Sequence, residues 1–64
     1  MLFDKGIKTV IIEPNMSVTG GYGVWIKEEN KYDRQWVFDG SLQACRIIAA
    51  AFVQVGYNCE NNGG

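Results

Sequence analysis

The side chains of this chain that could do chemistry are few, and they lack the partners that catalysis requires. The 64 residues include no histidine, which removes the usual general base near neutral pH and the commonest metal ligand. Ser17 and Ser41 have no histidine or lysine base at a recognisable spacing, and Cys45 has no histidine partner. The sequence therefore predicts a protein that is not an enzyme and has no catalytic residues.

The acidic residues do not form a catalytic or metal-binding set either. Glu28 and Glu29 fall in a predicted turn, and Asp33 is expected opposite Lys27 on a neighbouring strand. A carboxylate needs a desolvated pocket to act as an acid or base, and a sheet this small offers little depth. Residues 20–23 also lack the Gly-Lys-Ser/Thr of a phosphate-binding loop. We expect no metal site and no cofactor.

Length and charge restrict the class of protein further. Sixty-four residues allow one domain, and 47% hydrophobic with 20% charged residues is typical of a globular chain. The formal charge of −1 argues against a basic clamp for nucleic acid. Two cysteines are too few for a disulfide scaffold, and no apolar run has the length of a membrane span. We expect a cytoplasmic protein with free thiols and no membrane contact.

The hydrophobic pattern predicts three strands followed by one helix. Residues 7–13 are rich in β-branched side chains and stop at Pro14. Residues 22–27 and 32–38 flank a polar turn and are typical of a hairpin. The predicted fold class is α+β, a small three-stranded, antiparallel-rich sheet in βββα order packed against one C-terminal helix. The order of the strands in the sheet stays open.

Pairing centred on Asn30 predicts the hairpin register, with Val24 opposite Trp36. The side chains expected to fill the core between sheet and helix are Ile7 or Val10, Ile11, Tyr22, Val24, Ile26, Trp36, Phe38, Leu42, Cys45, Ile48, Phe52 and Val55.

A capping residue and a helix-ending glycine predict a helix over residues 41–55. Ser41 is the expected N-cap, Gly56 the left-handed residue that ends the helix, and Tyr57 the hydrophobic contact that follows it. Residues 58–64 are polar and glycine-rich, so we expect a single domain over residues 1–57 and a flexible tail.

One helix covers only one side of a three-stranded sheet. The outer side is then expected to present Trp25 and Val37, together with Val10 and Ile12, to solvent. An exposed apolar cluster with an aromatic centre marks a binding or dimer surface. In the other interpretation, the loop over residues 14–20 covers Trp25.

Two segments resemble known families. Gly21, Tyr22 and Gly23 resemble part of the aromatic strand motif of RNA-recognition-motif domains, although Gly20 and Val24 replace its basic and second aromatic residues. The starts Gly-Gly-Tyr at residues 20–22 and Gly-Ser-Leu-Gln-Ala at residues 40–44 resemble those of the antitoxins of the HicAB type, although the proline-rich segment of that family is absent. In size and layout the chain is also similar to small inhibitors encoded by phages and mobile elements, including anti-CRISPR proteins.

We therefore expect a non-enzymatic module that binds a protein partner and inhibits it by occlusion, with a homodimer possible. The expected partner-binding residues are Trp25, Gln35 and Val37 on the outer sheet face, with Lys31, Tyr32 and Arg34 as a polar rim. One alternative is a module for single-stranded nucleic acid or RNA, in which Tyr22, Trp25, Lys27, Lys31 and Arg34 stack on bases and bind phosphates. Another is an antitoxin-like domain.

Overall fold

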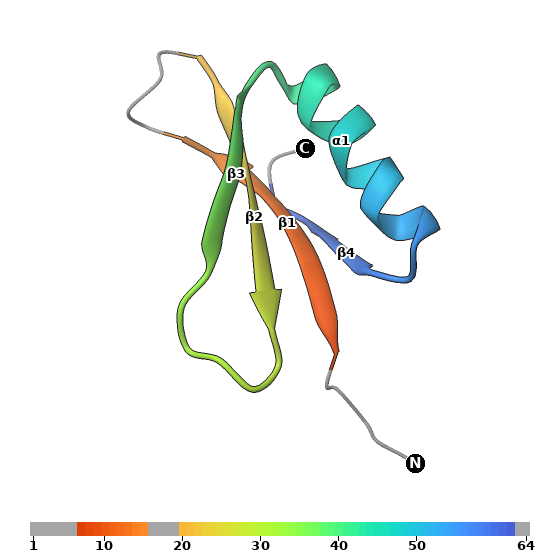
Figure 1. Cartoon of the computed structure of the whole chain (residues 1–64). Helices are drawn as coiled ribbons and strands as arrows, with labels where there is room; N and C mark the ends of the chain where they lie inside the picture. The colour runs from red at the N-terminus through yellow and green to blue at the C-terminus, as the bar shows by residue number, and fades with distance from the viewer. Residues whose placement is uncertain (1–6, 16–19, 63–64) are drawn as a thin grey trace.

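The computed structural model describes residues 7–15 and 20–62 of the chain. These residues form a four-stranded mixed sheet and one helix. In chain order the elements are β1 (Lys8–Pro14), β2 (Tyr22–Glu28), β3 (Gln35–Gly40), α1 (Leu42–Gln54) and β4 (Asn58–Asn61) (Figure 1). The order across the sheet is β3-β2-β1-β4, and β1 runs antiparallel to β2 but parallel to β4. The helix α1, the one helix among the described residues, is not long and apolar enough to cross a membrane.

The α+β class is confirmed, but the sheet contains a fourth strand that the sequence did not predict. β4 forms from residues that were expected to lie in a flexible tail, and it pairs with β1 from Thr9 opposite Asn58 to Ile12 opposite Asn61. The amide of Asn62 continues the ladder to the carbonyl of Ile12 at 2.8 Å. An edge strand exposed along its length can keep a polar composition, because backbone hydrogen bonds to β1 order it. The expectation of a tail is therefore wrong for residues 58–61.

Both ends of α1 are as predicted. The Ser41 hydroxyl accepts a hydrogen bond from the Ala44 amide at 3.1 Å, which caps the first turn. Gly56 has a φ of 107°, and the Tyr57 amide donates to the carbonyl of Phe52. The rings of Tyr57 and Phe52 meet edge to face with centroids 5.0 Å apart. Capping thus fixes where the chain leaves β3 and where it returns to β4.

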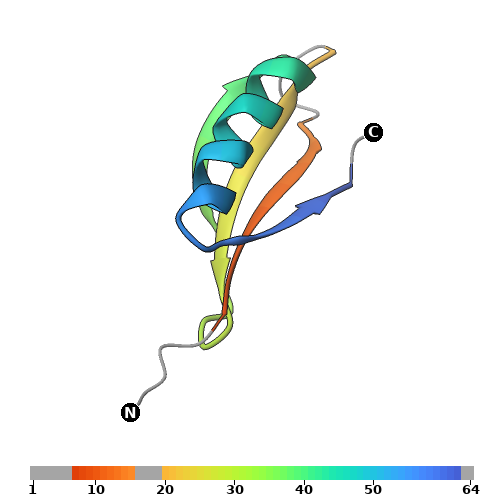
Figure 2. The ribbon, with the colours of Figure 1, turned by 90° about the vertical axis from the view of Figure 1, so that its right-hand side faces the viewer.

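The core lies between α1 and one face of the sheet (Figure 2). Val10 and Ile12 of β1 and Val24 of β2 meet Cys45 and Ala49 of the helix there. Partly buried side chains surround these residues: Tyr22, Ile26, Phe38, Leu42, Ile48, Phe52 and Tyr57. Most of the predicted core is therefore confirmed.

Five side chains lie elsewhere than the sequence pattern indicated. Ile12 was expected on the outer face but fills the core, whereas Ile11 was expected in the core but lies on the opposite face of β1, because side chains alternate along the strand. Val10, which the sequence offered for either place, is in the core. Val55 is 74% exposed at the C-cap, and Ile7 is exposed ahead of β1, so neither is in the core. Trp36 is also exposed, because the pairing of β2 with β3 differs from the predicted pairing.

The hairpin register is not the predicted one, and β3 also contains a bulge. Val24 pairs with Phe38, but the next residue, Trp25, pairs with Trp36, so Val37 is an extra residue on β3. The extra residue reverses the alternation of side chains along β3. Phe38 therefore faces the helix while Trp36 faces away from it, and the predicted pairing of Val24 with Trp36 is wrong.

Candidate functional site

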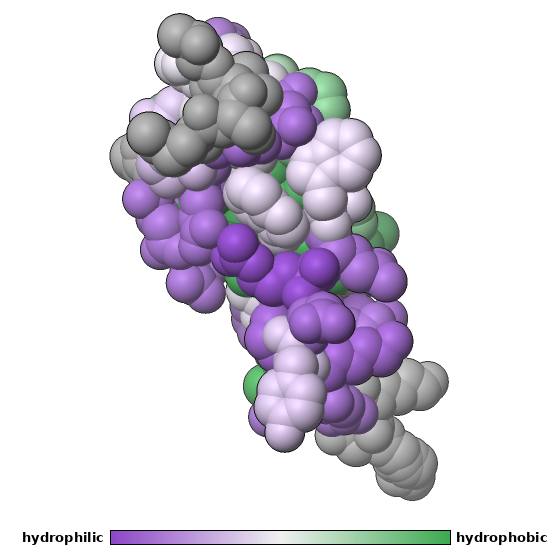
Figure 3. Space-filling model, turned by 90° about the vertical axis from the view of Figure 1, so that its left-hand side faces the viewer, coloured by the Kyte–Doolittle hydropathy of each residue, from purple (hydrophilic) through white to green (hydrophobic). Residues whose placement is uncertain are grey.

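The sheet has a second face, opposite α1, over which no helix lies in the described part of the chain. We call it the helix-free face. Strand alternation and register assign its residues from the three longer strands as Thr9, Ile11, Glu13, Gly23, Trp25, Lys27, Trp36 and Asp39. Figure 3 shows this side of the molecule, where hydrophilic residues surround pale residues of intermediate hydropathy. Ile11, at 6% exposure, is nevertheless buried on this face.

Trp25 is only partly exposed, because Gly23 lies against the edge of its ring and Arg34 lies over the ring. A Cβ on Gly23 would lie 2.5 Å from Cη2 of Trp25, so the ring occupies the space that a side chain at Gly23 would take. The guanidinium carbon of Arg34 lies 4.8 Å from the ring centroid, within the range of a cation–π contact. Gly23 at the edge of the ring and Arg34 over the ring therefore hold Trp25 in one position.

Arg34 is fixed in turn by an ion pair across the sheet. Its Nη1 lies 3.0 Å from Oε2 of Glu13 on β1. The hydrogen bond from Arg34 is the main reason that the pKa of Glu13 is lowered, and a hydrogen bond from Asn62 adds to it. The sequence placed Arg34 on a rim near the hairpin end. The structure places its side chain over Trp25.

Trp36 is the exposed indole of this face. Its side chain is 61% exposed, and its Nε1 donates a hydrogen bond to Oδ1 of Asp39 at 2.9 Å. The same oxygen accepts a hydrogen bond from the side-chain amide of Asn15. Sequence reasoning assigned Trp36 to the core, because alternation without a bulge puts it beside Val24. No residue pattern marks the bulge, so this part of the site was not predictable.

The remaining candidate residues lie outside the cluster formed by Glu13, Trp25, Arg34, Trp36 and Asp39. Lys31 and Tyr32 lie in the turn beyond β2, where Tyr32 is 98% exposed. Gln35 pairs with Ile26 and is therefore on the helix side of the sheet, which corrects its expected place on the outer face. Val37 is exposed at the bulge next to Trp36.

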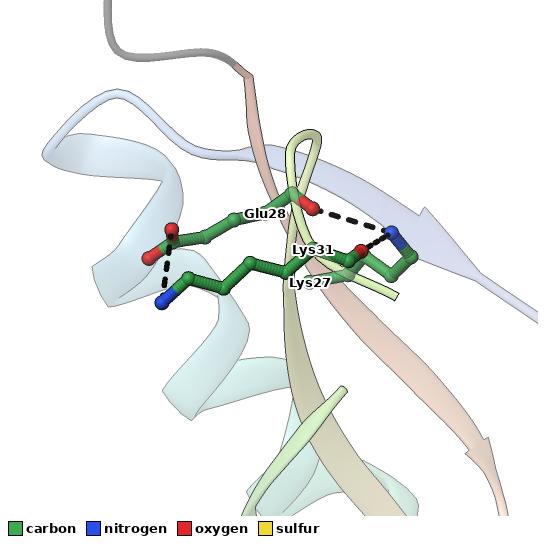
Figure 4. Close-up of polar contacts among 3 residues, drawn as sticks. All are labelled: Lys27, Glu28 and Lys31. Atoms are coloured by element: carbon green, nitrogen blue, oxygen red, sulfur yellow. Dashed lines mark hydrogen bonds and ion pairs between the residues drawn. The ribbon is translucent and has the colours of Figure 1, made fainter. Parts of the chain in front are cut away.

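Polar contacts join Lys27 and Glu28, at the end of β2, to Lys31 in the turn (Figure 4). Nζ of Lys27 donates to the carbonyl of Glu28 at 3.2 Å and to the carbonyl of Lys31. Nζ of Lys31 lies 3.7 Å from Oε1 of Glu28. The expected pairing of Lys27 with Asp33 is therefore replaced by contacts that close the turn.

The charged groups of the cluster already have partners within the protein. Glu13 pairs with Arg34, and Asp39 accepts hydrogen bonds from Trp36 and Asn15. Among the described residues, no three His, Cys, Asp or Glu side chains gather in a way that would hold a metal ion. The arrangement offers an apolar contact area with polar groups already oriented around it.

The thiols lie away from this cluster. Cys45 and Cys59 are both free. Cys45 lies on the core side of α1 and is buried. This burial, together with the charge of Asp39, raises the pKa of its thiol. A thiol that resists ionisation is a poor nucleophile, so Cys45 has a packing role.

No model of a known protein family matches this chain, and no curated protein or solved structure is similar to it.

Proposed function

We propose that this chain is a non-enzymatic protein-binding module whose contact surface is the helix-free face around Trp36. One observation carries the proposal: the indole of Trp36 is 61% exposed and held in place by Asp39, directly beside the covered indole of Trp25. Trp and Arg are the residues that most often dominate the binding energy of protein interfaces. A ring already fixed before binding loses little conformational entropy when a partner covers it.

The surroundings of Trp36 support a protein partner. Val37 is also exposed, next to Trp36 in β3, and Glu13, Arg34 and Asp39 are polar groups near the two indoles. An apolar centre with a polar rim is the usual arrangement of a protein interface. The opposite charges on this face balance locally, as expected for a surface that meets a protein rather than a polyanion.

We infer that binding inhibits the partner by occlusion, as for the small inhibitors of phages and mobile elements. The support is the size of the chain together with its site. A 64-residue module without a reactive group on its contact face changes a partner by covering part of its surface. An antitoxin-like role would use the same face in the same way. In either role we expect the protein to act in the cytoplasm.

The nucleic-acid alternative has less support. Tyr22, which was expected to stack on a base, instead faces the helix and packs against the core. The ammonium group of Lys27 is held by carbonyls of the turn. Trp36 and Arg34 would remain as the base-stacking and phosphate-binding residues of this hypothesis.

Affinity capture from the native host tests the proposal. The immobilised wild-type chain should retain a specific protein. The Trp36→Asp variant should not retain it, although circular dichroism should show that the variant is folded. Val55→Asp is the matched control, because Val55 is also strongly exposed but lies at the end of α1. A folded Trp36→Asp variant that keeps every partner of the wild type would refute the proposed surface.

A titration with a single-stranded oligonucleotide tests the alternative. Tryptophan fluorescence that responds at low salt, with affinity lost as salt rises, would favour binding to phosphates. A protein contact centred on an indole should change little over the same range of salt.

A further inference from the structure

The outer side of α1 is apolar although it faces solvent. Ile47 is 65% exposed and Val53 is 45% exposed, and Ala50 and Ala51 are also exposed. Arg46 is the one charged residue among the 13 of the helix. A helix on the surface of a globular protein normally carries charged and polar residues opposite its core side. The composition of α1 is that of a helix covered on both sides.

A hollow lies beside this exposed surface. It has a volume of about 480 Å³ and is open to solvent between α1 and the edge strand β4. Its helix wall includes Arg46, Ala50 and Val53, and Ile12 and Cys59 lie on the sheet side. The hollow flanks the exposed surface, and Ile47 is not part of its lining. An interface between identical subunits related by a two-fold axis requires a patch that is complementary to itself.

The sequence of α1 is symmetric about Ala50 in chemical character. Ile47 and Val53 each lie three residues from Ala50, one on either side. Arg46 and Gln54 each lie four residues from it. Residues three and four apart share one face of a helix, so all five lie on the same side of α1. If two such helices pack antiparallel with a two-fold axis at Ala50, Ile47 of each copy meets Val53 of the other.

The same arrangement avoids repulsion between like charges. Each Arg46 would lie opposite Gln54 of the other copy, and the two Arg46 positions would be about 12 Å apart along the helix axes, at 1.5 Å per residue. The small side chain of Ala50 would let the helix axes approach to about 10 Å, with the two methyl groups in contact at the axis. Shape and charge on this face therefore both suit a second copy of the same chain.

We propose that two copies of this protein associate through α1, packed antiparallel about Ala50. This surface is separate from the helix-free face, so the proposal stands independently of the proposed function. The dimer would present two copies of the Trp36 surface. A helix of 13 residues is about 20 Å long and buries less than the roughly 800 Å² per partner of a standard interface. The dimer is therefore weak, with a Kd on the order of micromolar or higher.

Sedimentation equilibrium of the full chain tests the dimer between about 1 µM and about 1 mM, a range that spans such a Kd. The mass should rise with concentration from 7.1 kDa toward twice that value. Ala50→Glu places two like charges at the axis and should weaken association at least about tenfold. Ala51→Glu is the matched control, because it makes the same change at the next exposed residue, about 100° around the helix. It should associate nearly as the wild type does.

A cross-link provides a test that does not depend on the folding of the Ala50→Glu variant. In a Cys59→Ser background, Ala50→Cys should form a disulfide-linked dimer on oxidation, because the two introduced thiols meet at the axis. Ala51→Cys in the same background should cross-link far more slowly. A wild-type mass that stays at 7.1 kDa throughout would overturn the proposal and leave the face free or open to a different protein. Equal effects at positions 50 and 51, in either experiment, would also overturn it.

Discussion

Trp25 and Trp36 lie directly opposite each other on β2 and β3, on the face of the sheet that α1 leaves uncovered. Their environments differ. Trp25 is packed between Gly23 and Arg34, whereas Trp36 is largely exposed and bonded to Asp39. One indole therefore supports the surface and the other is available for contact. The two should respond differently to substitution.

The close approach of Trp25 to Gly23 makes a side chain at position 23 costly. Gly23→Ala would place a methyl group 2.5 Å from Cη2 of Trp25, so the indole must move from beneath Arg34. We expect a loss of about 1–3 kcal/mol in the free energy of unfolding, measured by urea denaturation. In a Trp25→Ala background the same change should be nearly neutral. An equal loss in both backgrounds would show that the strain has another source.

The ion pair of Glu13 with Arg34 predicts a pH dependence of stability. The pKa of Glu13 is lowered in the fold, so the unfolded chain binds its proton more readily. The stabilisation is fully present above the unfolded pKa of about 4.3 and is lost as the pH falls through the folded pKa. Because both side chains are partly exposed, it should amount to less than about 1 kcal/mol. Urea denaturation from pH 2 to 7 measures it, with the pH points chosen to bracket the unfolded pKa.

Two variants give the comparison for this prediction. Glu13→Gln should remove the whole contribution of this carboxyl group to the pH dependence, and Arg34→Met should remove its largest part, because the hydrogen bond from Asn62 to Glu13 remains. If Glu13→Gln keeps the full dependence of the wild type, other carboxylates are responsible.

The parallel strand β4 should contribute measurably to stability. Truncation after Tyr57 removes the backbone ladder to β1 and leaves the edge of that strand open. Four paired residues at about 0.5–1.5 kcal/mol per hydrogen bond predict a loss of about 2 kcal/mol or more in the free energy of unfolding. Removal of residues 63–64 alone is the control, because it keeps β4 and Asn62. A truncation after Tyr57 as stable as the full chain would show that β4 is not part of the fold.

The end of α1 depends on the backbone conformation of Gly56. Its φ of 107° is one that side chains with a Cβ rarely adopt. Gly56→Ala should destabilise the fold by about 1 kcal/mol, whereas Gly56→Asn should cost clearly less, because asparagine tolerates left-handed conformations better. Thermal denaturation of the two variants measures the difference. Equal losses of stability in the two variants would mean that the left-handed conformation of residue 56 does not determine the cost of the substitution.

Local signals predicted the helix well. Ser41, Gly56 and Tyr57 each act through backbone atoms a few residues away, so their roles depend little on the rest of the fold. The core side of α1 was predictable for a related reason, because helical spacing alone puts Cys45 and Phe52 on one side.

Features that depend on contacts between distant segments were not predictable. The bulge at Val37 shifts the register between two strands, and only that shift brings Trp36 to the helix-free face. β4 is ordered by the edge of β1, about 50 residues earlier in the chain, and nothing in its polar sequence distinguishes it from a frayed end. The candidate surface itself was anticipated, but with Trp25 at its centre rather than Trp36.

The affinity of the captured partner protein for Trp36→Ala tests the central claim most directly. Truncating a dominant interface residue costs about 2 kcal/mol or more, which corresponds to at least about a 30-fold rise in Kd. Val55→Ala, which also shortens a strongly exposed side chain, should bind as the wild type does. A folded Trp36→Ala variant that binds the partner with wild-type affinity would contradict the assignment of the helix-free face as the contact surface.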